Sequence, residues 1–121
     1  MISDAIATPV KVIRRARIIP TDTVAVFGAG GGLGIHMLML ARWAHTKVIA
    51  VETRPEKFQA CKEAGADQVI DGNRNDLTEA LVEASSGGIE VSIDFVSSEQ
   101  TLETAMNALG KGGRLVTLGG S

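Results

Sequence analysis

The sequence predicts an α/β fold of three layers, in which helices cover both faces of one open, parallel β-sheet. Two observations lead to this fold class. Short apolar runs alternate along the chain with segments whose apolar residues recur at helical spacing. Glycines stand at the ends of these segments, where a chain turns. Right-handed crossovers between parallel strands then give the expected strand order 3-2-1-4-5, in a single domain of 121 residues.

The expected strands are five short apolar runs, at residues 24–27, 48–51, 68–70, 91–96 and 114–118. The expected helices are 33–44, 53–64, 77–84 and 102–109, with one more over 3–17 that Pro9 would kink. The fifth strand would lie at an edge of the sheet. Because an edge strand offers unpaired backbone groups, we expect it to be the contact in any homo-oligomer.

Three local expectations concern the helices. The first is apolar most of the way round, including Trp43, and is therefore expected to be largely buried. Thr53 and Glu56 have the spacing of a capping box, and Pro55 suits a first helical turn. Cys61 is expected to be a structural thiol, at least half-buried.

A glycine-rich stretch, Gly28 to Gly34, joins the first strand to the first long helix. It contains the six-residue fingerprint Ala29-x-Gly31-x-x-Gly34. In this fingerprint Ala29 is expected at the tight turn, Gly31 opposite a phosphate group, and Gly34 at the point where the helix packs close to the sheet. Side chains in such a turn would block the approach of an anion to the helix N-terminus. The next strand ends in Glu52, and the order strand, glycine turn, helix, strand, acid is typical of a dinucleotide-binding site.

Glu52 indicates which of the two nicotinamide dinucleotides, NAD or NADP, the site prefers. A carboxylate at this strand end accepts hydrogen bonds from the ribose hydroxyls of NAD and repels the 2′-phosphate of NADP. Arg54 could pair with that phosphate, so NADP stays open as the less favoured cofactor. The carboxyl ends of parallel strands meet at one edge, and the further contacts expected there are Gly28, Gly30, Gly32, Leu33, Thr53, Phe95, Val96, Leu118 and Gly119. Asp94, also at a strand end, is a candidate acid, although a carboxylate at such a position is more often a helix-cap or loop partner than a catalyst.

Composition excludes several other classes. The net charge of −2 and the lack of a basic cluster argue against nucleic acid and anionic membranes as partners. Neither a leader nor a long apolar span is evident, and the single cysteine forms no internal disulfide, so a reducing cytoplasm is expected. His36 and His45 lack ligand-spaced partners, so no metal site is expected. His45 is instead expected to end the first long helix.

Several motifs in this order resemble a known family. They are residues 28–34, 48–52, 56–58, 65–70, 93–96 and 112–116. Together they resemble the cofactor domain of the medium-chain dehydrogenase/reductases, the zinc-type alcohol dehydrogenase family, over nearly the whole chain. The resemblance implies a Rossmann fold, pyrophosphate binding at Gly31, Gly32 and Leu33, ribose binding at Glu52, and a ribose or phosphate contact from Lys57. On the nicotinamide side it implies contacts from Val96, Leu118 and Gly119.

The sequence also departs from the family pattern. Thr21, His45 and Ser97 stand where the family often has glycine. Family members also have a mostly β catalytic domain, which carries any zinc ligands, and a sixth strand; the sequence is therefore expected to be a truncated or excised cofactor domain, inactive by itself.

Three functions remain open from the sequence. The first is the NAD-binding part of an alcohol or polyol dehydrogenase, which is zinc-dependent if the zinc ligands lie in the catalytic domain. The second is the same part of a zinc-free NADPH quinone or enoyl reductase. The third is a non-redox module that binds an adenosyl ligand, although Val26-Phe27 stands where such proteins usually have an acid before the glycine loop.

Overall fold

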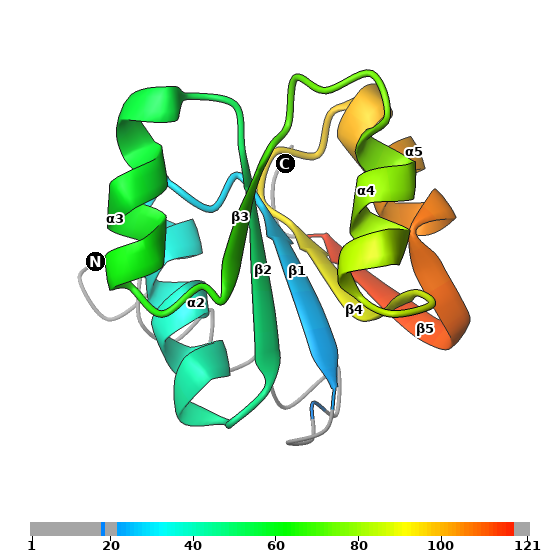
Figure 1. The fold of residues 1–121 in the computed structure, drawn as a ribbon, viewed down its shortest axis with the longest axis horizontal. Helices are drawn as coiled ribbons and strands as arrows, with labels where there is room; N and C mark the ends of the chain where they lie inside the picture. The colour runs from blue at the N-terminus through cyan, green and yellow to red at the C-terminus, as the bar shows by residue number, and fades with distance from the viewer. Residues whose placement is uncertain (1–17, 19–21, 118–121) are drawn as a thin grey trace.

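The computed structural model describes Ile18 and residues 22–117, which form one parallel sheet covered by helices on both faces. The elements are β1 Thr23–Phe27, α2 Gly32–Trp43, β2 Lys47–Glu52, the 3₁₀ turn η1 Pro55–Lys57, α3 Phe58–Glu63, β3 Gln68–Asp71, α4 Leu77–Ala84, β4 Ile89–Asp94, α5 Glu99–Asn107 and β5 Leu109–Thr117. The strand order is β3-β2-β1-β4-β5, and all pairings are parallel, so the predicted fold class is confirmed. Figure 1 shows α2 and α3 on one side of the sheet and α4 and α5 on the other.

The central strand β1 divides the apolar interior into two cores. Val24 and Val26 pack toward α2 and α3, in a cluster that includes Met37. Ala25 and Phe27 point the other way and pack toward α4 and α5. Successive side chains of a strand alternate between faces, and all four of these residues are at most 1% exposed. Burial on both faces therefore fixes the end of β1, from which the glycine-rich stretch leaves the sheet.

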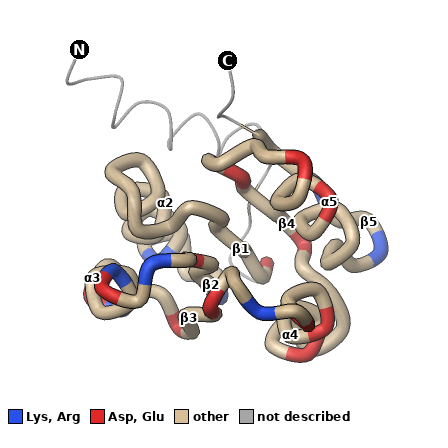
Figure 2. The backbone as a smooth tube through the Cα atoms, turned by 90° about the horizontal axis from the view of Figure 1, so that it is seen from above, with Lys and Arg blue, Asp and Glu red and all other residues tan. Residues whose placement is uncertain are grey.

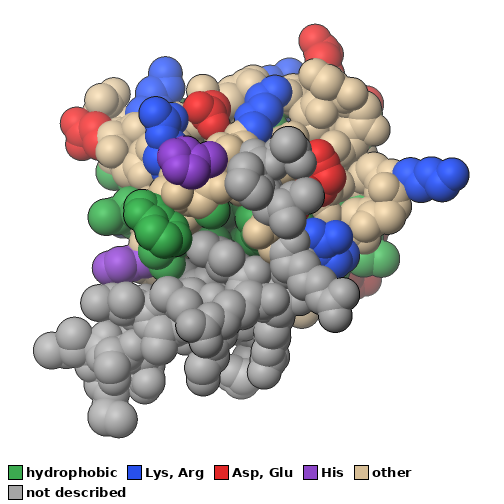
Figure 3. Space-filling view, turned by 90° about the horizontal axis from the view of Figure 1, so that it is seen from below, with side chains coloured by type: hydrophobic (Ala, Val, Ile, Leu, Met, Phe, Trp, Pro, Cys, Tyr) green, Lys and Arg blue, Asp and Glu red, His purple; other side chains and the backbone are tan. Residues whose placement is uncertain are grey.

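Helix α2 is less buried than its sequence predicts. Only Gly34, Met37, Leu38 and Ala41 are buried, whereas Trp43 is 78% exposed and Met39 51% exposed. From below, hydrophobic side chains reach the described surface near the two histidines (Figure 3). One stripe of the helix faces the sheet, and the apolar residues outside that stripe have no described element above them. The prediction of a largely buried helix is therefore wrong.

Helices α2, α3 and α4 end with the same backbone geometry. After α2, His45 adopts the left-handed conformation with φ 65°, and its N–H donates to Arg42 O at 2.9 Å. The N–H of Thr46 donates to Ala41 O at 3.3 Å, which completes a Schellman motif. Gly65 and Ser86 occupy the equivalent left-handed positions after α3 and α4. The expectation that His45 ends the first long helix is confirmed, at a position where glycine is the least strained residue.

Several predicted boundaries differ from the structure, among them the start of β5, which is Leu109 instead of 114, and the ends of β4 and α5. β4 ends at Asp94 instead of 96, because the Asp94 carboxylate accepts the N–H groups of Val96 and Ser97 and turns the chain out of the sheet. α5 ends at Asn107 instead of 109, because Leu109 already pairs with Ile89 as the start of β5.

The expected capping box at Thr53 is also not formed. No side chain caps η1, and the N–H groups of Thr53 and Arg54 donate to the Glu52 carboxylate instead. The capping box of the described chain is at α5, where Ser98 and Thr101 bond reciprocally.

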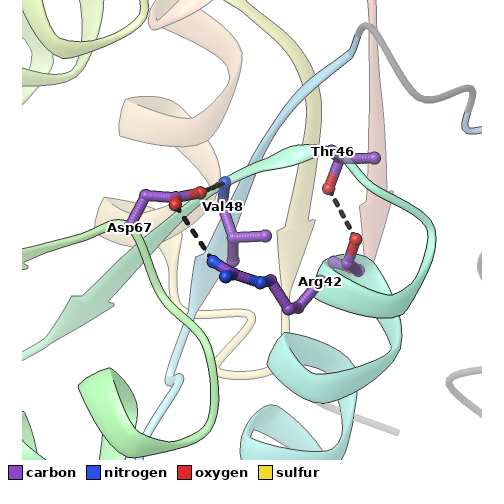
Figure 4. Close-up of polar contacts among 5 residues, drawn as sticks. Arg42, Thr46, Val48 and Asp67 are labelled. Atoms are coloured by element: carbon purple, nitrogen blue, oxygen red, sulfur yellow. Dashed lines mark hydrogen bonds and ion pairs between the residues drawn. The ribbon is translucent and has the colours of Figure 1, made fainter.

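Asp67 fixes the start of β2 at the edge of the sheet opposite the glycine-rich stretch (Figure 4). Its Oδ2 accepts the N–H of Val48, a residue that is 0% exposed, at 2.8 Å. Its Oδ1 lies 3.4 Å from Arg42 Nη1, an ion pair between largely exposed groups. The bond to Val48 is the more important of the two, because an exposed ion pair contributes little and an unpaired buried N–H is costly.

We expect Asp67→Ala to lower the free energy of unfolding by about 2 kcal/mol, since it leaves the Val48 N–H without its acceptor. Asp67→Asn, which keeps an acceptor oxygen and loses only the charge, should cost less than about 1 kcal/mol. Urea unfolding followed by circular dichroism measures both. Equal losses for the two variants would contradict the importance given to the Val48 bond.

Candidate functional site

A cleft lies where β1, β2 and β4 end. Its volume is about 520 Å³. The predicted site residues that line it are Gly28, Gly31, Gly32, Leu33, Gly34, Glu52, Thr53, Arg54, Lys57, Phe95 and Val96. Gly30 is absent from the lining but contacts Glu52, and Leu118 and Gly119 lie outside the described residues.

The tight turn after β1 begins at Gly28. Gly28 has φ 75°, a conformation that only glycine adopts without strain, and the N–H groups of Gly28 and Ala29 both donate to Val51 O. Ala29 is fully buried. The N–H of Gly31 donates to Gly28 O at 3.2 Å, so Ala29 lies inside the tight turn, where the sequence placed it, and Gly28 supplies the left-handed conformation that opens the turn.

Gly34 and Gly31 serve different purposes in the stretch. A Cβ atom on Gly34 would clash with the carbonyl oxygens of Gly28 and Ala29, so the absence of a side chain lets α2 begin directly on the turn. A Cβ atom on Gly31 would meet only Gly28 O, at 3.6 Å, and one on Gly32 would meet nothing within 4 Å. Gly31 and Gly32 thus open onto the cleft, where a ligand has room to approach their backbone.

The N-terminus of α2 faces the cleft with free hydrogen-bond donors. The first bond of the helix runs from Ile35 N–H to Gly31 O at 2.8 Å, so the N–H groups of Gly32, Leu33 and Gly34 precede the helical ladder. No side chain caps this end, and no acidic residue lies in the first turn. Uncapped donors and the positive end of the helix dipole together favour an anion.

Glu52 stands beside this helix end at the end of β2. It is only 7% exposed, and its carboxylate accepts three backbone N–H groups. Oε1 accepts from Gly30 at 2.7 Å, and Oε2 accepts from Thr53 at 2.9 Å and Arg54 at 3.0 Å. These three bonds fix the position of the carboxylate, so Glu52 brings a negative charge to a defined place in the cleft.

Two cationic side chains lie at the same end of the cleft. Arg54 is exposed and Lys57 is half-buried, and neither forms an ion pair with another described residue within 4 Å. Over the rest of the described chain, the positions of Lys and Arg are spread along the backbone and interspersed with those of Asp and Glu, as the view from above shows (Figure 2).

The opposite wall of the cleft is the turn after β4. Asp94 is 0% exposed, and its Oδ1 accepts the N–H groups of Val96 at 2.8 Å and Ser97 at 2.9 Å. Its Oδ2 accepts the Thr101 hydroxyl at 2.8 Å. These bonds hold Val96 against Gly28, where an added Cβ atom would lie 2.9 Å from Val96 Cγ2. Asp94 is therefore a loop partner, as expected from its position at a strand end.

Neither Cys61 nor the histidines form a reactive centre in the described part of the chain. Cys61 is 0% exposed, and its burial, reinforced by the negative charge of Glu52, raises the pKa of the thiol. It is the buried structural thiol that was predicted. The ring of His36 bonds to Gly32 O through Nδ1 at 2.9 Å. No three His, Cys, Asp or Glu side chains of the described residues come together to hold a metal ion, so these residues do not fit zinc.

The sequence did not predict five residues that line the cleft, namely Phe27, Val51, Gly72, Leu77 and Thr101. Phe27 and Val51 are the strand residues directly before the glycine-rich stretch and before Glu52, so their strand-end positions could have indicated them. Gly72 follows β3, and Leu77 and Thr101 lie in the first turns of α4 and α5. A second cavity of about 450 Å³ shares five lining residues with the cleft, namely Thr53, Gly72, Leu77, Val96 and Thr101.

The fold and the cleft define a Rossmann-like domain in which an uncapped helix N-terminus faces the cleft. Residues 32–121 match the sequence model of the family described as "Zinc-binding dehydrogenase", and the chain belongs to this family. It is 39% identical over 114 residues to the NAD-dependent alcohol dehydrogenase of Saccharolobus solfataricus, a match that covers 93% of this chain and 33% of the relative. The chain thus spans about a third of the length of this relative.

Solved structures of other proteins superpose on the chain. The crystal structure of AibC shares 35% sequence identity, with a TM-score of 0.88 over 94% of this chain and 32% of that one. The quinone oxidoreductase of Thermus thermophilus, whose structures include a complex with NADPH, shares 27% identity, with a TM-score of 0.82 over 93% of this chain and 36% of that one. Both alcohol dehydrogenases and quinone oxidoreductases are therefore among its relatives. In the described residues no helix is long and apolar enough to cross a membrane.

Proposed function

We propose that this chain binds a nicotinamide dinucleotide in the cleft, with NAD(H) preferred over NADP(H), as the cofactor-binding domain of an oxidoreductase similar to alcohol dehydrogenases. One observation carries the proposal. The uncapped N-terminus of α2, opened by Gly31 and Gly32, lies beside a buried carboxylate, Glu52, that is bonded to the same glycine-rich stretch. A donor-rich site for phosphate next to a fixed acceptor for ribose matches the chemistry of a dinucleotide.

Each part of the cleft has a distinct task in this proposal. The N–H groups of Gly32 and Leu33 donate to the pyrophosphate, and the dipole of α2 stabilises its charge. Phe95 and Val96 form an apolar wall beside the rest of the cofactor, together with Leu118 and Gly119 if these follow β5 as expected. Bound in this way, the nicotinamide ring supplies hydride transfer, and the protein supplies orientation and electrostatics.

Glu52 supports the preference for NAD(H). Its three backbone bonds use three of the roughly four acceptor positions of a carboxylate, which leaves one for a ribose hydroxyl. A 2′-phosphate would lie beside this fixed negative charge in a partly desolvated site, where like charges repel strongly. A phosphate therefore binds there less well than a hydroxyl.

A second candidate is the cofactor domain of a zinc-free NADPH-dependent quinone or enoyl reductase. Arg54 and Lys57 favour it, because they place cations that could face a 2′-phosphate at the Glu52 end of the cleft. The relative from T. thermophilus has a structure with NADPH. A non-redox module for an adenosyl ligand has no such support, since the chain belongs to a dehydrogenase family.

Titration of the purified chain with NADH and NADPH distinguishes the two candidates. Trp43 is the only tryptophan of the sequence, so energy transfer to the bound dihydronicotinamide reports binding. We expect NADH to bind about tenfold more tightly than NADPH. NADH gains one hydrogen bond to the Glu52 carboxylate and avoids the repulsion between that carboxylate and a 2′-phosphate. Equal affinities, or tighter binding of NADPH, would contradict the role given to Glu52 and favour the reductase.

We also expect the purified chain of 121 residues to reduce no aldehyde or ketone with NADH. Hydride transfer to a carbonyl requires a metal or acid that stabilises the developing alkoxide. The ionisable groups that line the cleft, Glu52, Arg54 and Lys57, all lie at one end of it, and the described residues offer no ligand set for zinc. The assay is NADH oxidation over a carbonyl panel, with added zinc and then with chelator. Turnover that requires zinc would overturn this expectation.

A further inference from the structure

We propose that Gly30 determines the choice between NAD(H) and NADP(H), although it does not line the cleft, because it is the residue against which the Glu52 carboxylate is seated. This inference rests on the proposed function and deepens it. The carboxylate would select the cofactor, and Gly30 would hold the carboxylate where it can do so. Gly30 is thus a positioning residue that acts through Glu52.

The contact between the two residues is direct and close. The N–H of Gly30 donates to Glu52 Oε1 at 2.7 Å, in a buried hydrogen bond between residues 22 positions apart in the sequence. A Cβ atom on Gly30 would lie 2.5 Å from the same oxygen and 2.8 Å from both Cβ and Cδ of Lys57. The absence of a side chain at Gly30 therefore leaves the space that the Glu52 carboxylate and the Lys57 stem occupy.

Glycine is needed at residue 30 because it leaves space for neighbouring side chains, and not because of its backbone conformation. The glycines of this stretch that adopt a positive φ include Gly28 but not Gly30. An alanine can therefore adopt the backbone of residue 30, and the only obstacle is the side chains against it. Gly31 and Gly32 differ, since an added Cβ atom there meets no side chain within 4 Å.

A side chain at residue 30 would displace the two charged groups nearest the adenosine ribose. The Glu52 carboxylate would lose its bond to the Gly30 N–H, and any rotation would also weaken its bonds to Thr53 and Arg54. The displaced carboxylate would then neither accept a hydrogen bond from a ribose hydroxyl nor repel a 2′-phosphate. The affinity for NADH falls, whereas that for NADPH falls less or rises, because the repulsion is removed along with the acceptor.

The test is the ratio of the dissociation constants of NADPH and NADH for Gly30→Ala, with Gly32→Ala as the matched control in the same stretch. We expect Gly30→Ala to lower this ratio about tenfold, the equivalent of one hydrogen bond to a charged group. Gly32→Ala alters the site of the pyrophosphate, which both cofactors share, so it should change both dissociation constants alike and leave their ratio constant. A general loosening of the loop would weaken both cofactors equally and leave the ratio as it was. An unchanged ratio for Gly30→Ala overturns the inference alone; failure of the wild-type chain to bind either dinucleotide overturns the proposed function as well.

A second variant keeps the test decisive if Gly30→Ala does not fold. Glu52→Asp withdraws the carboxylate by one methylene and opens room for the new methyl group. We expect the double variant Gly30→Ala/Glu52→Asp to fold and to have the same ratio as Glu52→Asp alone, because the two side chains no longer collide. If the double variant is unfolded, or differs from Glu52→Asp as strongly as Gly30→Ala differs from the wild type, the obstacle is not the Glu52 carboxylate and the inference is wrong.

Discussion

Gly31→Val is expected to weaken NADH binding at least about 100-fold, because the lost phosphate contacts are hydrogen bonds to a charged ligand, of about 1.5–3 kcal/mol each. The space beside Gly31 is open, since an added Cβ atom would meet only Gly28 O at 3.6 Å. The two methyl groups of valine would fill this space over the N–H groups of Gly32 and Leu33. Calorimetric titration with NADH measures the loss.

The same variant should remain folded. Gly31 has φ −77° and ψ 172°, which is extended backbone that valine adopts readily. We expect the free energy of unfolding to change by about 1 kcal/mol at most, the cost of a poorer residue at a helix N-cap. Full NADH affinity in a folded Gly31→Val protein would show that the phosphates lie elsewhere.

Gly34→Ala is expected to lower the free energy of unfolding by about 2 kcal/mol or more, the cost of forcing an atom into a packed site. Helix propensity alone predicts the opposite sign, since alanine stabilises a helix interior by about 1 kcal/mol relative to glycine. The steric effect should dominate, because the new Cβ atom would collide with backbone carbonyl oxygens of Gly28 and Ala29, which cannot move without opening the turn.

The control for this variant is Gly32→Ala, at the first position of the same helix, where an added Cβ atom meets nothing within 4 Å. It should leave the stability unchanged or raise it slightly. Thermal unfolding of both variants measures the difference, and a Gly34→Ala protein as stable as Gly32→Ala would show that α2 does not rest on the turn.

The strand order followed from the sequence because each element carries its own signal. The β-branched runs of β1 and β2 are buried on both faces, and the glycines at residues 65, 72 and 87 stand just beyond element ends. The sequence did not predict the boundaries at which a strand-end carboxylate bonds to the backbone N–H groups directly after it, because residue spacing does not specify the orientation of that side chain. Asp94 ends β4 by accepting the Val96 N–H, and Glu52 accepts the N–H of Thr53, which a capping box would direct to the Glu56 side chain.

For the candidate site, the sequence predicted which residues lie close together. It did not predict the contacts that fix their positions. Gly28 to Gly34 and Glu52 were expected to lie together because the carboxyl ends of parallel strands share an edge. The bond from Gly30 to Glu52 and the contact of Gly34 with the turn depend on separations of a few ångströms, which spacing in a sequence does not specify. The exposure of Trp43 was missed for a related reason, since apolar periodicity shows a stripe but not which neighbours cover it.

All of the binding predictions require a dinucleotide to occupy the cleft between the glycine-rich stretch, Glu52 and the turn after β4. Backbone amide resonances of the isotopically labelled chain, followed during addition of NADH, report where the ligand sits. We expect the largest shifts at Gly31 to Gly34, Thr53 and Val96, all of which border the cleft, and little change at Val48 and Asp67 on the opposite edge of the sheet. Saturable shifts confined to other residues, or no shifts at millimolar NADH, would rule out this binding site.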